Sequence, residues 1–210
     1  MKGTPDTKSH TSVWRSLIEV PIVAGLAVVI VVILRALVVQ PFYIPSASMV
    51  PQLHVDDKIL VSRISYRLHP VRRGDLIVFA EPPGVQLEEG PSPSHEGGIS
   101  GLWRSVAETL GLVPRSDELV KRVIGLPGDT VEGHDGHVYI NGRLLLEPYL
   151  KPDVVTSDFA AQTVPKGMVW VMGDNRPDSY DSRFFGPIRE RTIVGRAILK
   201  VWPLDNICFL

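Results

Sequence analysis

Two serine hydroxyls stand two residues apart in the segment from Pro45 to Pro51, which reads Pro-Ser-Ala-Ser-Met-Val-Pro. In an extended chain, side chains at positions i and i+2 point the same way, so Ser46 and Ser48 would face a common site. One hydroxyl can attack a carbonyl carbon while the other steadies the charge that develops on the oxygen. Serines between prolines are also common in plain polar turns, so catalysis requires a base elsewhere in the chain.

Histidine, the usual partner of a catalytic serine, is poorly placed in this sequence. His54 and His69 fall in expected loops, and His95 lies in a stretch rich in Pro, Gly and Ser. His10 precedes a long apolar segment. A Ser-His-Asp triad is therefore disfavoured, although the order of residues alone leaves it open.

Lys121 is the remaining candidate base. It opens a β-rich run that continues into a Gly-Leu-Pro-Gly-Asp turn at residues 125–129. A lysine in such a run is usually a solvated charge, and the periodicity does not tell which face it takes. If Lys121 is buried beside Ser48, the loss of hydration would lower its pKa and leave the neutral amine that serine–lysine catalysis requires.

Composition disfavours several other classes of function. The 210 residues include 22 basic and 23 acidic side chains without a basic patch or tail, so no nucleic-acid partner is expected. Cys208 is the only cysteine, which excludes an intramolecular disulfide, a cysteine metal cluster and dithiol chemistry but leaves the compartment open. His134 and His137 flank Asp135-Gly136 at a spacing that could ligate a metal, but a solvated hairpin tip explains them better, so no metal site is predicted.

The segment from Val20 to Val39 is apolar except for Arg35, and as a helix it would span about 30 Å, the thickness of a bilayer core. Two alternatives stay open, a buried core helix and a cleavable signal peptide with its small-residue site at Ser46-Ala47-Ser48. The length of the segment and the prolines before that site favour a permanent anchor. Basic residues before the segment favour an N-terminus inside the cell, although basic residues also follow it.

Beyond this segment the sequence predicts a mostly β domain. Turn signals separate short β-rich runs, and Asn141-Gly142 is typical of a tight hairpin between residues 138 and 145. The predicted strands are 58–61, 75–79, 120–124, 137–140, 168–172 and 192–201. Residues 81–100 are expected to form a surface loop, and residues 102–112 one helix.

Five stretches in this order resemble the motifs of bacterial type I signal peptidases, a serine/lysine dyad family. They are the apolar segment, Pro45–Leu53, Gly74–Phe79, Lys121–Asp129 and Gly173–Arg176, the last continuing through residues 179–183 to Phe185-Gly186. One such motif would be weak evidence. Five motifs in the family's order, which together cover the chain from the apolar segment to Gly186, are much stronger evidence. Gln52 departs from the pattern, because the family often has threonine there; it lies outside the reacting groups and puts only local packing in doubt.

The resemblance implies a signal-peptidase-like β-sheet catalytic domain, no cofactor, Ser48 as nucleophile and Lys121 as general base. It further implies that Ser46 contributes to the oxyanion hole and that Ser179 orients Lys121. Structural support is expected from Asp174, Asn175, Asp181 and Arg183. Pockets for small side chains before the cut would be lined by residues at the positions of Phe42, Ile44, Pro45, Met49, Leu53, Leu119 and Val120.

The implied function is that of a single-pass enzyme of the cell membrane that cleaves signal peptides from secretory preproteins. Residues 1–16 would be a cytoplasmic tail, 17–39 a transmembrane helix in the lipid bilayer, and 40–210 an extracytoplasmic catalytic domain with a variable insert at 81–115. Nine residues separate Val39 from Ser48, so the nucleophile would lie at most roughly 30 Å beyond the anchor. That short tether matches a substrate whose cleavage site lies just outside the bilayer.

Two other functions are weighed against this one. A self-cleaving serine–lysine protease of the SOS-repressor type would share the dyad, but this chain opens with an apolar segment rather than a helix-turn-helix domain. A membrane-tethered binding module that has lost catalysis would not need both Ser48 and Lys121, and both are present.

Overall fold

The structure is a computed structural model that describes residues 22–27, 38–82 and 118–210. The chain divides into two units, Met1–Val38 and Val39–Leu210. In the first unit, residues 22–27 are helical, and no helix within the described residues is long and apolar enough to cross a membrane. Most of the predicted anchor, the tail before it, nearly all of the predicted insert and the predicted helix at 102–112 lie outside the described residues.

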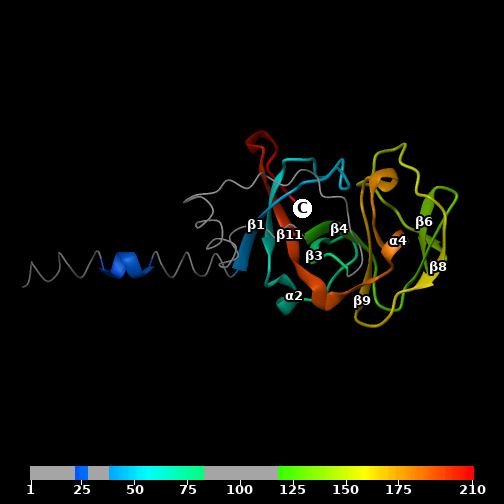
Figure 1. Cartoon of the computed structure of the whole chain (residues 1–210), viewed down its shortest axis with the longest axis horizontal. Helices are drawn as coiled ribbons and strands as arrows, with labels where there is room; N and C mark the ends of the chain where they lie inside the picture. The colour runs from blue at the N-terminus through cyan, green and yellow to red at the C-terminus, as the bar shows by residue number, and fades with distance from the viewer. Residues whose placement is uncertain (1–21, 28–37, 83–117) are drawn as a thin grey trace, which may run out of the picture. The chain divides into compact units, whose positions relative to one another are not determined.

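The second unit is built on a large antiparallel sheet (Figure 1). Within the described residues its strand order is β1-β2-β11-β3-β4-β9-β10, with β12 paired to β11. Its strands are β1 (Val39–Tyr43), β2 (Lys58–Ser62), β3 (Leu76–Ala80), β4 (Glu118–Gly125), β9 (Met168–Met172), β10 (Ile188–Arg189), β11 (Ile193–Trp202) and β12 (Cys208–Phe209). The long strand β11 lies between β2 and β3, so it joins the first hairpin of the unit to the rest of the sheet.

A smaller antiparallel sheet has the order β7-β6-β5-β8. Its strands are β5 (Thr130–His134), β6 (His137–Ile140), β7 (Arg143–Leu144) and β8 (Phe159–Thr163). Asn141 and Gly142 join β6 to β7 with φ values of 53° and 73°, the left-handed geometry of a type I′ turn. The hairpin predicted from Asn-Gly is therefore confirmed.

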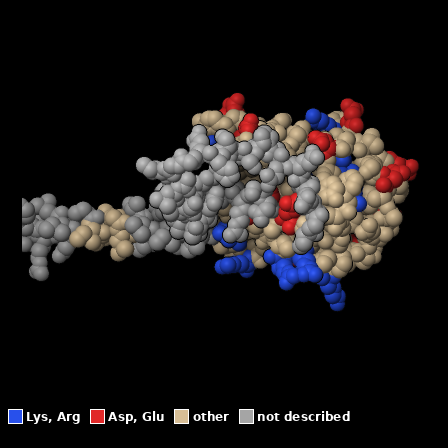
Figure 2. Space-filling view, in the orientation of Figure 1, with Lys and Arg blue, Asp and Glu red and all other residues tan. Residues whose placement is uncertain are grey.

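Short helices complete the described fold. They are α2 (Ser65–Leu68), α4 (Ser182–Phe185) and the 3₁₀ turns η1 (Arg176–Asp178), η2 (Glu190–Thr192) and η3 (Leu204–Asn206). Exposed arginines lie in and beside α2, at positions 63, 67 and 72. In Figure 2, basic side chains gather along the lower edge of the molecule, where Figure 1 places α2, and most of the acidic side chains visible on this face lie apart from them.

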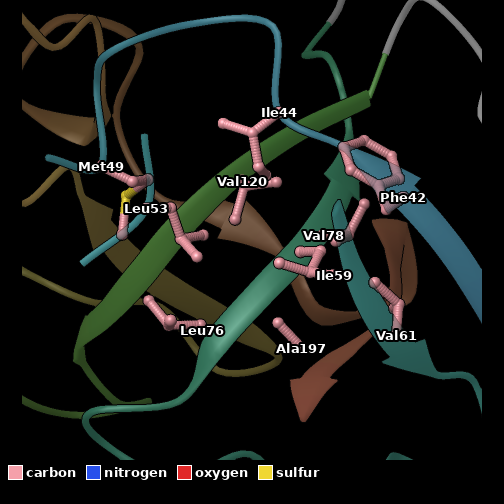
Figure 3. Close-up of a cluster of buried hydrophobic side chains, with 10 residues drawn as sticks. All are labelled: Phe42, Ile44, Met49, Leu53, Ile59, Val61, Leu76, Val78, Val120 and Ala197. Carbon is pink, nitrogen blue, oxygen red and sulfur yellow. The ribbon is translucent and has the colours of Figure 1, made fainter. Parts of the chain in front are cut away.

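Three hydrophobic clusters form the core of the second unit, and β4 contributes to each of them. Of these three, only the second cluster joins the large sheet to the small one. Val120 belongs to the first cluster, with residues of β1, β2 and β3 (Figure 3). Ile124 belongs to the second, which contains Trp170 of β9 and apolar residues of the small sheet. Val123 belongs to the third, with apolar residues of β3 and β9. From Val120 to Gly125 every residue of β4 is therefore buried, including the polar side chains of Lys121 and Arg122.

The mostly β fold is confirmed, and β2, β3, β4, β6, β9 and β11 correspond to the six predicted strands. The sequence reading missed β1, β5, β8, β10 and β12. Strand β1 contains Pro41, which cannot donate a ladder hydrogen bond and is tolerated because β1 forms the edge of the sheet. Strand β8 is mostly exposed and reads Phe-Ala-Ala-Gln-Thr, so its sequence carries little β signal.

Candidate active site

Ser48 and Lys121, 73 residues apart in the sequence, meet in the structure. The Nζ atom of Lys121 lies 2.6 Å from the Oγ atom of Ser48, within hydrogen-bonding distance. Ser48 is 8% exposed and Lys121 only 3%, so the contact is shielded from water. An amine and a hydroxyl in this relation can exchange a proton directly.

Burial tunes the amine of Lys121. Removal of water lowers its pKa from 10.5 to about 8, an effect that Asp181 opposes and Arg183 supports through their charges. The position of Lys121 in the sheet explains its burial, because Ile77 pairs with it on β3 and its neighbours on β4 enter the three clusters. A lysine with this pKa is partly neutral near physiological pH and can act as a base.

A tight turn presents Ser48 to the lysine. The backbone N–H of Val50 donates to the carbonyl of Ala47 at 3.1 Å, and that of Leu53 donates to Met49 at 2.9 Å. The side chain of Met49, next to Ser48, is buried in the first cluster and fixes the turn to the core. The Oγ atom of Ser46 lies 3.3 Å from that of Ser48. The two hydroxyls therefore lie close together, but a turn brings them there rather than the extended chain that the prediction assumed.

The segment after β9 holds the nucleophile turn from its other side. Asn175 donates its backbone N–H to the carbonyl of Ser48 at 3.0 Å and its side-chain amide to the carbonyl of Ala47 at 3.1 Å. Gly173 approaches so closely that a Cβ atom there would lie 2.5 Å from the Ser48 carbonyl oxygen and would also collide with Ser179. Only glycine fits at this position without displacing the nucleophile turn.

Ser179 is buried beside Gly173, but its hydroxyl differs from what the resemblance implies. Its Oγ atom has no hydrogen-bond partner among the described residues, so the bond expected between Ser179 and Lys121 is absent from this structure. The Ser179 side chain packs on the Cα of Gly173 instead, while the Lys121 amine donates to Ser48.

Two buried ion pairs frame the segment from residue 173 to residue 183. Asp181 accepts from the backbone N–H of Gly173 at 3.0 Å and pairs with Arg183 at 2.8 Å. Arg122, adjacent to Lys121, binds both carboxylate oxygens of Asp174 at 2.8 and 2.6 Å. Burial raises the pKa of Asp174 above its usual value, and the Arg122 guanidinium opposes that rise. Both carboxylates are therefore held by hydrogen bonds rather than by water.

The residues expected to line substrate pockets fall into three environments. Five of them are buried in the first cluster: Phe42, Ile44, Met49, Leu53 and Val120. Figure 3 shows Met49, Leu53 and Val120 gathered beside β4, with Phe42 farther along the same layer. Leu119 packs against the third cluster, and Pro45 is exposed.

The sequence does not predict some residues of the site. Arg122 lies in the Lys121–Asp129 motif, but nothing in its residue type shows that it pairs with Asp174. Glu147 and Tyr149 lie in the loop after β7, where no motif marks them, yet they contact Arg176 and Arg122 respectively. A charged and an aromatic residue in an otherwise ordinary loop give no signal until the fold brings them to the site.

The histidines near the hairpin tip do not form a metal site within the described residues. His134 and His137 are paired across β5 and β6, and both are exposed. The ring of His134 stacks on Tyr139 with centroids 3.8 Å apart. No group of three or more His, Cys, Asp or Glu side chains in the described part of the chain is arranged to hold a metal ion.

Comparison with known proteins follows the same outline. The family described as "Signal peptidase, peptidase S26" matches residues 17–202. A signal peptidase I of Leptolyngbya laminosa is 38% identical over 87% of this chain and 78% of its own length. A signal peptidase I of Mycobacterium tuberculosis is 36% identical over 90% of this chain and 73% of its own.

A crystal structure of a signal peptidase I from Enterococcus faecalis is 32% identical, with a TM-score of 0.42 over 61% of this chain and 97% of that one. Membership of the family rests on the sequence matches, which cover the nucleophile turn, β4 and the segment after β9. They confirm the family predicted from the five motifs. This chain therefore belongs to the signal peptidase family of peptidases, peptidase S26.

Proposed function

We propose that this chain is a membrane-anchored serine endopeptidase that removes N-terminal signal peptides from exported preproteins with a Ser48/Lys121 dyad. The observation that carries the proposal is the 2.6 Å contact between the Lys121 amine and the Ser48 hydroxyl. Burial that lowers the lysine pKa to about 8 gives this contact its chemical meaning, because only the neutral amine can accept a proton.

In the first half of the reaction, Ser48 Oγ attacks the carbonyl carbon of the scissile bond and Lys121 takes the hydroxyl proton. The oxyanion that forms accepts hydrogen bonds from the Ser48 backbone N–H and the Ser46 hydroxyl. When the carbon–nitrogen bond breaks, Lys121 returns the proton to the leaving amine. Lys121 then deprotonates a water molecule, whose oxygen bonds to the acyl carbon. The ester bond to Ser48 breaks, Lys121 returns the proton to Ser48 Oγ, and the signal peptide leaves as a carboxylic acid.

Ser179 remains the hydroxyl proposed to orient Lys121. Its Oγ atom is buried and unpartnered among the described residues, so it has hydrogen-bonding capacity that no other described group uses. A hydroxyl suits this task better than a carboxylate, whose negative charge would raise the lysine pKa. Asp174, Asn175, Asp181 and Arg183 act as structural support through the hydrogen bonds and ion pairs already described.

The proposed substrate has small side chains before the cut, which would bind against the first cluster around Met49, Leu53 and Val120. Apolar groups there suit alanine-like residues, since a small apolar side chain loses no hydrogen bond on burial. The apolar segment at 17–39 would anchor the enzyme in the bilayer, with the N-terminus in the cytoplasm and the catalytic domain outside. Nucleophile and cleavage site would then lie at one height above the membrane.

The test is cleavage of a purified preprotein by the detergent-solubilised chain and by its Ser48→Ala variant. Wild-type protein should release the signal peptide, and the variant should release none while retaining the wild-type melting temperature. Ser65→Ala provides the matched control, because it also removes one hydroxyl but lies on α2, outside the named site. Cleavage by Ser48→Ala at a rate near that of wild type would remove Ser48 from the mechanism.

A further inference from the structure

Arg176 carries a buried charge that the proposed mechanism does not use. Its side chain has no measurable exposure, and it donates to both oxygens of Glu147 at 2.5 and 3.1 Å. It also donates to the Thr156 hydroxyl at 2.8 Å and to the carbonyl of Gly173 at 2.9 Å. Arg176 therefore links the loop after β7 to the segment that holds the nucleophile turn.

A second link closes this network into a ring. The Tyr149 hydroxyl donates to Glu147 at 2.6 Å, and the Tyr149 aromatic ring lies 3.9 Å from the guanidinium carbon of Arg122. Arg122 binds Asp174, two residues before Arg176. The ring contains two arginines and two carboxylates, so the four charges balance while the side chains stay out of water.

The ring is connected to both partners of the proposed dyad through residues next to them in the chain. On one side it fixes Gly173 and Asp174, which immediately precede the Asn175 that binds the carbonyls of Ala47 and Ser48. On the other side it fixes Arg122, the residue after Lys121 on β4. A change in the ring would thus be transmitted to the separation of Ser48 and Lys121.

Stability alone does not explain so many buried charges. Apolar side chains of similar volume often stabilise a core as well as a buried ion pair does, whereas ion pairs with several hydrogen bonds fix direction as well as distance. Glu147 has a side chain only 8% exposed, and it receives hydrogen bonds from two different side chains. These two hydrogen bonds fix the orientation of the Glu147 carboxylate, as expected of a residue that positions its neighbours.

We propose that Glu147 and Tyr149 are positioning residues for peptide cleavage, and this rests on the proposed Ser48/Lys121 function. They act through Arg176 and Arg122 to hold residues 173–175, against which the carbonyl of Ser48 is bound. The loop after β7 therefore contributes to catalysis without touching the substrate or the reacting atoms.

The experiment measures kcat and KM of the full chain in detergent with a preprotein substrate. Glu147→Gln should lower kcat at least tenfold and change KM less than twofold, because the nucleophile is displaced while the pocket is kept. Tyr149→Phe should lower kcat by a smaller factor, since it removes only the hydroxyl and leaves the aromatic ring over Arg122. Glu132→Gln on β5 is the matched control for loss of one carboxylate in the small sheet and should behave like wild type.

A second measurement separates positioning from general weakening of the fold. In an Asn175→Ala background, one of the hydrogen bonds from the ring segment to the nucleophile turn is already lost. The factor by which Glu147→Gln lowers kcat should therefore be at least three times smaller in the Asn175→Ala background than in the wild-type background. The change in melting temperature caused by Glu147→Gln should be the same in both backgrounds. If Glu147→Gln does not fold, the same comparison between the wild-type and Asn175→Ala backgrounds is made with Tyr149→Phe.

The proposal is overturned if kcat is unchanged in both ring variants, or if their losses are equally large in the two backgrounds. Its failure is distinct from failure of the proposed function. If wild type cleaves the preprotein and Ser48→Ala does not, the dyad stands whatever the ring variants do.

Discussion

At the scale of single residues, the amine of Lys121 combines deep burial with a hydrogen bond to a candidate nucleophile. Its pKa of about 8 means that roughly a tenth of the molecules carry the neutral amine at pH 7. The value of kcat/KM should therefore rise with pH and level off above about pH 8. Lys121→Arg should be inactive throughout, because its guanidinium stays protonated at working pH. Steady-state cleavage rates measured from pH 6 to 10 check both expectations.

A different base would give a different result. If Lys121→Arg kept substantial turnover, or if the acidic limb disappeared on replacement of a histidine, the proton acceptor would have to be sought elsewhere in the chain.

The same burial should make Lys121 costly for stability. Because its pKa is about 8 when folded and near 10.4 when unfolded, the unfolded chain binds more protons between these values. The depressed pKa thus costs the folded state roughly 3 kcal/mol at neutral pH. Lys121→Met should abolish activity and raise the melting temperature, as calorimetry at pH 7 can measure. A lower melting temperature would show that hydrogen bonding to Ser48 outweighs the loss of hydration.

Ser46 gives a graded test of the oxyanion role. Its hydroxyl lies 3.3 Å from that of Ser48. It is therefore close enough to donate a hydrogen bond to the oxyanion that forms on the carbonyl carbon attacked by Ser48. Ser46→Ala should slow kcat by roughly 10² to 10³ and leave KM nearly unchanged. Single-turnover cleavage is the appropriate measurement, and an unchanged rate would make Ser46 a turn residue only.

The residue types and spacing made Ser48 and Lys121 candidates, and the resemblance to signal peptidases assigned them the roles of nucleophile and base. The partner of Asp174 was not visible. Any of several arginines has the right charge, and only the register that sets Arg122 opposite Met172 at the end of β9 selects one. The resemblance implied a hydrogen bond between Ser179 and Lys121 that this structure does not contain, because that bond depends on rotamer geometry that no sequence pattern encodes.

At the scale of elements, the close approach of the segment after β9 to the nucleophile turn depends on Gly173. Gly173→Ala would place a methyl group 2.5 Å from the Ser48 carbonyl oxygen, so the two segments must separate and the bonds from Asn175 must weaken. We expect kcat to fall at least tenfold. Gly195→Ala is a matched control, because its Cβ would meet the Ser62 carbonyl at the same distance, between β11 and β2. It should lower the melting temperature while sparing kcat per folded molecule.

Strands with continuous apolar sequences were predictable because burial on both faces needs no alternation, as β3 and β9 show. The sequence does not predict strand β1, because its first residue continues the apolar segment before it and Pro41 interrupts it. Strand β8 forms because β5 offers a partner, so its existence is decided by pairing rather than by its own residues.

At the scale of the whole molecule, β11 is the link between the two parts of the dyad. Ser48 lies between β1 and β2, Lys121 lies on β4, and the sheet connects these strands only through β11 and β3. A chain ending at Thr192 should therefore lack activity and cooperative unfolding. A chain ending at Asn206 loses only β12 and the last residues, so it should keep activity with reduced stability, because Leu210 packs against the first cluster. Preprotein cleavage and thermal melts of the two truncated chains test this contrast.

The central place of β11 also sets the order of events when the protein is made. Ribosomes synthesise β1, β2, β3 and β4 before β11, so the serine and the lysine both exist while the strand that joins β2 to β3 is still missing. We therefore expect the Lys121 amine of the nascent chain to stay hydrated and protonated until β11 enters the sheet. Formation of the proposed catalytic pair is thereby tied to completion of the fold.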